Sequence, residues 1–277
     1  ASEIVDDKSE HCIPFILEKI KAHCDYHKKE GTDAPPFFLG LNGIQGAGKT
    51  TLVSNVLIPH IKPMRKSKCT RSSLVTQTNY YHLYAIFSLP ISHSYTIENT
   101  SNQPTISLGP LQNPNLTTSQ PTQVVLSIDD LYLPHSAQKS LAQSQPTNPL
   151  IQHRGQPSTH DIPLGKDIFS QLFSRQKNIR IPFYDKSAHS GQGDRTDPEA
   201  WEVVNKEGEP PVEVVIFEGW CVGFRSLSDE ELVQKWEAAK AARIFDGEAY
   251  HGRLAALELE HVSFVNEALR QYDALTE

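Results

Sequence analysis

One string of eight residues constrains this chain more than any other feature. It reads Gly43-Ile44-Gln45-Gly46-Ala47-Gly48-Lys49-Thr50, a full match to the pattern GxxxxGK[ST], and it begins two residues after the short apolar run Phe37–Leu41. Glycines at these positions let backbone N–H groups surround phosphate oxygens, and the helix that follows directs its positive end at the same anion. In such loops Lys49 reaches the β- and γ-phosphates and the Thr50 hydroxyl ligates Mg²⁺. The string predicts a nucleotide-phosphate site between a strand and a helix.

Two more apolar runs, Val124–Ile128 and Val212–Phe217, have the continuous apolar character of buried parallel strands. Helical patterns accompany the runs, at Ser9–Glu30, Thr50–Ile58 and Leu164–Phe173, and from a capping box of Ser228 and Glu231 onward. Strands that alternate with helices indicate an α/β fold, a parallel sheet with helices on both faces. Ligands bind such sheets at the carboxyl ends of the strands, so the residues after each run are the candidate site.

Composition excludes several classes of protein. The 277 residues carry a net charge of −7, which argues against a nucleic-acid or anionic-membrane binder. No apolar run has the roughly 20 residues that span a bilayer, and the acidic N-terminus lacks the apolar core of a secretory signal. The four cysteines form no CxxC pair and suit a reducing compartment. We expect a cytoplasmic protein with a single domain over 1–277.

A polar insertion interrupts this domain. Between Ser72 and Gln123 the single charged residue is Glu98, and Ser, Thr, Asn, Gln and Pro dominate. Apart from a short apolar patch around Ile86, the stretch has no sustained period of 2 or 3.6. We therefore predict a low-complexity, disordered insertion over 62–123, either a surface loop or translated non-coding sequence.

Acidic residues follow the second and third runs. Asp129 and Asp130 come after Val124–Ile128, and because neighbouring side chains of a strand alternate, one of the two is a candidate general base that takes a proton from an acceptor hydroxyl. The alternative for either is a helix cap or turn. Glu218 follows the third run, where nucleotide-hydrolysing folds place a Mg²⁺-coordinating carboxylate; its alternative is a stray acid at the sheet edge.

Cations and a histidine cluster between these two runs. Arg154, Lys186 and Arg195 could neutralise an anionic substrate or a transferring phosphoryl group, although each alone is more often a solvated surface residue. His160, likewise, is more often a loop hydrogen-bonding group than a catalyst.

Five ordered strings of the chain resemble the D-glycerate 3-kinases of plants and their fungal relatives, P-loop kinases related to uridine kinase, phosphoribulokinase and pantothenate kinase. They are GIQGAGKTT, SIDDLYLPH, RGQPSTHD, PFYDKSAHSGQGDR and VVIFEGWCVGF. The resemblance implies a P-loop kinase fold and ATP·Mg²⁺-dependent phosphorylation of a small hydroxyl compound, with D-glycerate giving 3-phosphoglycerate as the leading candidate. The net charge and the apolar runs described above add the expectation of no nucleic-acid or membrane partner.

The resemblance also implies roles for individual residues. Gly43 to Thr51 would hold the ATP phosphates, Asp129 would be the base, Lys49 would act on the transferred phosphate, and Thr50 and Glu218 would hold the metal. The substrate residues it implies are Arg154, His160, Asp161, Tyr184, Asp185, Lys186 and Arg195.

Two departures from the family pattern affect these expectations. The insertion separates the phosphate loop from the second strand, and the family continues past Phe264–Thr276 into another core strand and further helices, so we expect a domain truncated at the C-terminus. Two alternatives stay open: an ATP-binding protein without kinase turnover, and a uridine-kinase-like nucleoside kinase in which Phe183, Tyr184 and Trp220 stack on a base.

Overall fold

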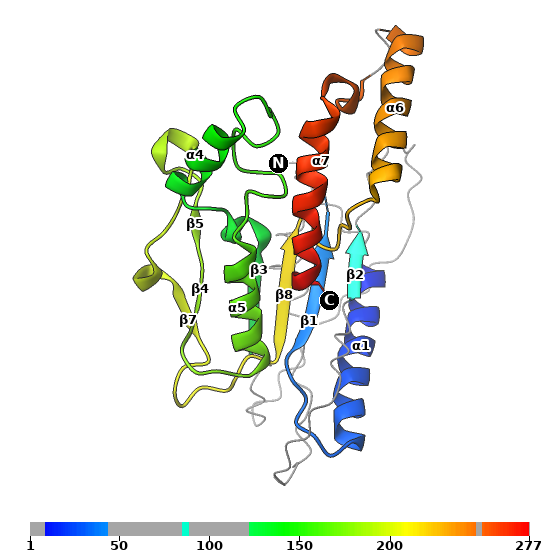
Figure 1. The fold of residues 1–277 in the computed structure, drawn as a ribbon. Helices are drawn as coiled ribbons and strands as arrows, with labels where there is room; N and C mark the ends of the chain where they lie inside the picture. The colour runs from blue at the N-terminus through cyan, green and yellow to red at the C-terminus, as the bar shows by residue number, and fades with distance from the viewer. Residues whose placement is uncertain (1–8, 44–84, 89–121, 248–250, 277) are drawn as a thin grey trace, which may run out of the picture.

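A parallel sheet forms the centre of the molecule. The computed structural model describes residues 9–43, 85–88, 122–247 and 251–276. Its sheet has four strands in the order β2-β1-β8-β3, all parallel (Figure 1). Their bounds are β1 Phe37–Asn42, β2 Ala85–Ser88, β3 Gln123–Ser127 and β8 Val214–Gly219. The predicted α/β class with a parallel sheet is confirmed.

Helix α1, Ser9–Lys29, covers one face of the sheet. Its Ile16 and Ile20 are buried against alternate residues of β1, namely Phe37, Leu39 and Leu41. Every residue of β1 is buried, because the strand has an apolar cluster on each side. A continuous apolar run is therefore the pattern that such a strand requires.

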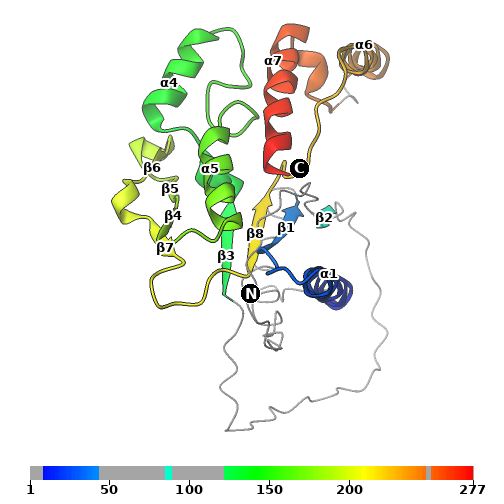
Figure 2. The ribbon, with the colours of Figure 1, turned by 60° about the horizontal axis from the view of Figure 1, so that its bottom comes forward.

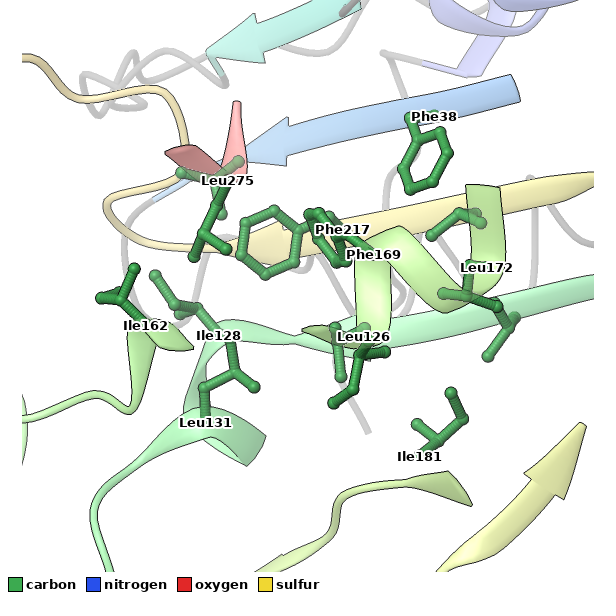
Figure 3. Close-up of a cluster of buried hydrophobic side chains, with 14 of the residues drawn as sticks. Phe38, Leu126, Ile128, Leu131, Ile162, Phe169, Leu172, Ile181, Phe217 and Leu275 are labelled. Carbon is green, nitrogen blue, oxygen red and sulfur yellow. The ribbon is translucent and has the colours of Figure 1, made fainter. Parts of the chain in front are cut away.

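Helix α5, Ile162–Phe173, covers the opposite face together with the C-terminal segment (Figure 2). The Phe169 ring of α5 lies 5.5 Å from that of Phe38 and 5.1 Å, edge to face, from that of Phe217. Figure 3 shows these rings among Leu126, Ile128 and Leu172. The sheet is therefore packed between helices on both faces, and this packing holds its strand ends in place.

Except for the C-terminal segment on the sheet face, the remaining elements extend beyond the carboxyl ends of the strands or lie beside β3 (Figure 1). The other α-helices are α4 (His135–Ser144), α6 (Asp229–Asp246) and α7 (Leu259–Leu269). Two small antiparallel sheets pair β4 (Ile179–Ile181) with β7 (Glu202–Val204), and β5 (Tyr184–Asp185) with β6 (Asp194–Arg195). The 3₁₀ turns are η2 (Ile128–Leu131), η3 (His189–Gly191), η4 (Pro198–Ala200), η6 (Leu254–Ala256) and η7 (Arg270–Leu275).

Most predicted elements are present with small shifts of their ends. The third strand begins and ends two residues later than predicted, so Glu218 is its fifth residue rather than the first residue after it. The capping box of Ser228 and Glu231 is confirmed at the start of α6, with both reciprocal hydrogen bonds formed. The predicted helix Thr50–Ile58 lies outside the described residues.

The expectation of a disordered insertion over 62–123 needs a correction at two places. Ala85–Ser88, within its apolar patch, form β2 and pair in parallel with Leu39–Asn42 at the edge of the sheet. Gln123 begins β3. The sheet therefore has one strand more than the three predicted. Four residues, of which three are apolar, are too few to show a period, but they suffice to add hydrogen bonds to an open strand edge.

No helix among the described residues has both the length and the apolar character needed to cross a membrane.

Candidate active site

The turn after β3 holds the predicted base. Asp129 lies in η2, whose first turn is capped by the Ser127 hydroxyl accepting the Asp129 N–H at 3.3 Å. Its carboxylate accepts a hydrogen bond from the Lys186 ammonium at 2.6 Å, and 28% of its side chain is exposed against 57% for Lys186. The structure thus brings together two of the predicted site residues at the carboxyl end of the sheet.

The neighbouring acid, Asp130, has a different role. Its carboxylate accepts the backbone N–H of Tyr184 at 3.2 Å, which ties η2 to the start of β5. Burial raises the pKa of Asp130 above its usual value, while hydrogen bonds from Tyr184 and Ser127 partly oppose the shift. Of the two adjacent carboxylates, Asp130 therefore ties the turn to β5, and Asp129 pairs with Lys186.

Glu218, the residue predicted to bind the metal, lies near the carboxyl end of β8. In the sheet register it pairs with Leu41 of β1 on one side and Ser127 of β3 on the other. Leu41 is two residues before Gly43, so Glu218 lies between the strand that leads to Asp129 and the strand that leads to the GxxxxGK[ST] string. Gly43 is the one residue of that loop that the structure describes; Ile44, Gln45, Gly46, Ala47, Gly48, Lys49, Thr50 and Thr51 lie outside the described residues.

Asn42 and Gly219, whose roles the sequence did not indicate, hold the end of β8 in place. The buried Asn42 side chain donates to the carbonyls of Val222 at 2.7 Å and Trp220 at 3.3 Å, joining the last residue of β1 to the turn after β8. At Gly219 an added Cβ would lie 2.3 Å from Cγ2 of Ile128, so only glycine lets β8 pass this close to η2.

Arg154 holds the loop that carries Lys186. Its guanidinium donates to the backbone carbonyls of Gly191 and Gln192, and at 3.5 Å to that of Lys186 itself. The guanidinium also lies over the Tyr184 ring, 5.6 Å from its centroid. Arg154 was expected to bind substrate, but several of its N–H donors instead bond to the backbone and shape the loop around Lys186.

Asp161 and Arg195 form a partly buried ion pair. Asp161 caps α5 by accepting the Leu164 N–H at 3.0 Å, and it also accepts from Arg195 at 3.0 Å. Arg195 donates in addition to the Tyr132 carbonyl at 2.9 Å, and 12% of its side chain is exposed. The pair joins the start of α5, β6 and the end of η2.

His160 is buried, with 4% of its surface exposed. It stacks on Tyr132, with ring centroids 4.4 Å apart, and its Nδ1 lies 2.6 Å from the hydroxyl of Tyr272. Burial lowers the pKa of His160 to about 4, with the charge of Asp129 opposing that shift. Tyr272 lies 112 residues further along the chain, and no sequence pattern linked it to this site.

The side chains of Tyr184 and Asp185 pack against or bond to neighbouring residues of the protein. Tyr184 is 3% exposed and packs edge to face on Tyr132, so it offers no free ring face for a nucleoside base. Asp185 accepts from the N–H and hydroxyl of Ser187, at 2.8 and 2.6 Å, and these bonds lower its pKa. Phe183 is 58% exposed, and the Trp220 ring packs edge to face on Phe224.

A histidine pair beside the site was also missed. The rings of His135 and His189 stack at 3.9 Å between centroids; His135 bonds to Gln192 at 2.8 Å and His189 to Asp194 at 3.0 Å. Asp194 also accepts the His135 backbone N–H at 2.8 Å. These contacts connect the start of α4 to the glycine-rich loop after β5. The one sequence signal for them was the close spacing of polar residues and glycines around Gly191.

Comparison with known proteins gives independent support for the resemblance. No protein-family model matches the chain. It is 30% identical over 216 residues to an uncharacterized kinase, mug58, of Schizosaccharomyces pombe, an alignment covering 78% of this chain and 56% of that protein. It is 29% identical over 202 residues to the chloroplastic D-glycerate 3-kinase of Arabidopsis thaliana, covering 72% of this chain and 31% of that one. The chain thus spans about half or less of the length of these curated relatives.

A solved structure gives the same result for the fold. The D-glycerate 3-kinase from Cryptococcus neoformans var. grubii superposes with a TM-score of 0.62 at 25% identity, covering 96% of this chain and 69% of the solved one. The described residues therefore have a P-loop kinase fold. Sequence and structure agree that the chain is a homologue of the D-glycerate 3-kinases and their fungal kinase relatives.

Proposed function

We propose that this chain is an ATP-dependent small-molecule kinase that phosphorylates D-glycerate to 3-phosphoglycerate. The observation that carries the proposal is the Asp129–Lys186 pair at the carboxyl end of β3, one strand away from Glu218 and two from the phosphate loop. The names of the plant relative and of the Cryptococcus structure support D-glycerate as the acceptor.

In this mechanism Asp129 acts on the acceptor hydroxyl. Its carboxylate takes the hydroxyl proton as the oxygen forms a bond to the γ-phosphorus of ATP and the bond to the β-phosphate oxygen breaks, releasing ADP. Lys186 holds the carboxylate in place at 2.6 Å, and with 57% of its side chain exposed it is also placed to meet an anionic acceptor. The chain's task is then positioning and charge neutralisation.

ATP and Mg²⁺ belong to the proposal as cosubstrate and metal. The phosphate loop supplies backbone donors and Lys49. A hard cation needs oxygen ligands, and the Glu218 carboxylate, at the strand end beside the loop, fits that requirement together with Thr50 of the loop. When bound, Mg²⁺ would neutralise charge on the phosphates.

Formation of 3-phosphoglycerate from D-glycerate, ATP and Mg²⁺ tests the proposal, with Lys49→Ala as the inactive control. Product from the unmodified chain and none from the variant supports a glycerate kinase. ATP binding with no product from any acceptor would overturn kinase turnover in favour of a nucleotide-binding protein. Phosphorylation of uridine in place of D-glycerate would favour the nucleoside kinase, an alternative that the buried Tyr184 ring does not support.

A further inference from the structure

The buried contact between Tyr272 and His160 links the C-terminal segment to the turn that carries Asp129. Tyr272 lies in η7 and is 4% exposed. Its hydroxyl contacts two groups of the RGQPSTHD string: it accepts the backbone N–H of Ser158 at 3.2 Å and lies 2.6 Å from Nδ1 of His160. Two bonds from one hydroxyl thus hold this string against η7.

Counting donors assigns the proton on the His160 ring. The ring is neutral at neutral pH because burial lowers its pKa to about 4, so it carries one N–H. The Tyr272 oxygen accepts the backbone N–H groups of Ser158 and His160, which use its two acceptor positions, so its own proton is the one shared with Nδ1. The ring N–H then lies on Nε2, which is buried and has no hydrogen-bond partner among the described residues. Within that part of the chain, Tyr272 is the ring's one polar anchor.

The His160 ring in turn supports the turn after β3. It stacks on Tyr132, and the two residues form an antiparallel backbone bridge. The Tyr132 N–H donates to the Asp129 carbonyl at 3.3 Å and closes the turn around the acid. The contacts therefore run from Tyr272 through His160 and Tyr132 to the backbone of Asp129.

We propose that Tyr272 is a positioning residue: its hydroxyl fixes the His160 ring in the Nε2–H form, and the ring holds Tyr132 and the Asp129 turn in the reactive geometry. The catalytic part of this inference rests on the proposed kinase function. The inference about the ring nitrogen does not.

Tyr272→Phe tests it by removing one oxygen and keeping the ring. We expect kcat to fall roughly tenfold or more, because small displacements of a reacting group are costly, while KM for ATP stays within about twofold. In ¹⁵N spectra of histidine side chains, we expect His160 of the unmodified chain to show protonated Nε2, and the variant a mixture of the two forms. His160→Gln identifies the signal, and Tyr26→Phe, at a residue 61% exposed on α1, is the matched control.

Each outcome decides a separate part. Unchanged kcat in a folded Tyr272→Phe protein, established by its thermal unfolding, would overturn the positioning role. Protonated Nδ1 in the unmodified chain would overturn the assigned anchor. If the unmodified chain transfers phosphate to no acceptor, the kinase proposal fails and the catalytic role of Tyr272 fails with it, while the spectra still decide the ring form.

Discussion

The Lys186 ammonium and the Asp129 carboxylate meet at 2.6 Å although 57 residues separate them in sequence. One lies in the turn after β3 and the other just after β5, so their contact depends on how the intervening segment folds back. Arg154 bonds and the Asp130–Tyr184 bond produce that fold. We therefore expect substitutions of Asp129 or Lys186 to change the reaction rate, and substitutions of the residues that hold the surrounding fold to change stability.

Replacement of the base should stop turnover and spare nucleotide binding. In Asp129→Asn the amide cannot take a proton, so we expect kcat to fall by about 10²–10⁴-fold with the Kd for ATP unchanged. Initial rates and equilibrium ATP titration measure the two quantities. Asp130→Asn is the matched control, since an amide oxygen still accepts the Tyr184 N–H. Equal rates for Asp129→Asn and the unmodified chain would remove Asp129 from the mechanism.

Lys186→Met should reduce activity with little effect on stability. Both partners of its ion pair are partly exposed, and such pairs contribute about 0–1 kcal/mol to the free energy of unfolding. We expect kcat/KM for the acceptor to fall at least about tenfold, because a charge-assisted hydrogen bond at the base is lost. Steady-state kinetics and urea unfolding check the two effects, with exposed Lys139→Met as control. A large loss of stability with normal kinetics would assign Lys186 a purely structural role.

Arg195→Met should destabilise the fold far more than loss of an exposed pair. It leaves Asp161 without its ion-pair partner and the Tyr132 carbonyl without a donor, which we expect to cost about 2–4 kcal/mol. Arg180→Met breaks the Arg180–Glu199 pair, in which the side chains are 39% and 82% exposed, and should cost less than about 1 kcal/mol. Urea unfolding of both variants gives the comparison; equal costs would contradict it.

His160 should make stability depend on pH. Its folded pKa, about 4, lies below the unfolded value of about 6.5, so the unfolded chain binds more protons between these pH values. Above pH 6.5 the ring is neutral in both states and does not lower the free energy of unfolding. As the pH falls from 6.5 towards 4, the free energy of unfolding decreases by up to about 3 kcal/mol.

The check is urea unfolding of the unmodified chain and His160→Asn at pH 7 and pH 4.5. The difference between the two proteins should shrink or reverse at the lower pH. His153→Asn, at an exposed ring, should follow the unmodified chain at both. A constant difference for His160→Asn would show that the ring does not stay neutral in the folded state.

The central strands β1 and β8 could be predicted because burial on both faces of a sheet demands continuous apolar runs. Phe37–Leu41 shows this demand directly in the order of its residues. β2 could not be predicted, since its four residues pair only because β1 offers an open edge. The short β4–β7 and β5–β6 pairs also depend on long-range packing rather than on their own pattern.

Within the candidate site, the sequence pointed to individual residues but not to the contacts between them. Asp129 and Lys186 were predicted separately, and their contact was not. Asp185 was expected at the acceptor pocket, but its oxygen bonds within its own turn to Ser187, an interaction that a short Asp-x-Ser spacing allows locally. Tyr272 was missed because its hydroxyl serves residues more than a hundred positions earlier.

The two bonds of Asn42 also determine where movement can occur. They join the strand that leads into the phosphate loop to the turn that follows Glu218, from within the core, so these two strand ends cannot separate without breaking buried bonds. The β5–β6 pair is likewise held to η2 by buried groups, the Tyr184 ring against Tyr132 and the Arg195 guanidinium on the Tyr132 carbonyl. The loop that carries Lys186, by contrast, is held by side chains that are partly exposed. We therefore expect any movement around a bound acceptor to be confined to the loop that carries Lys186, while the two strand ends that Asn42 joins stay in place.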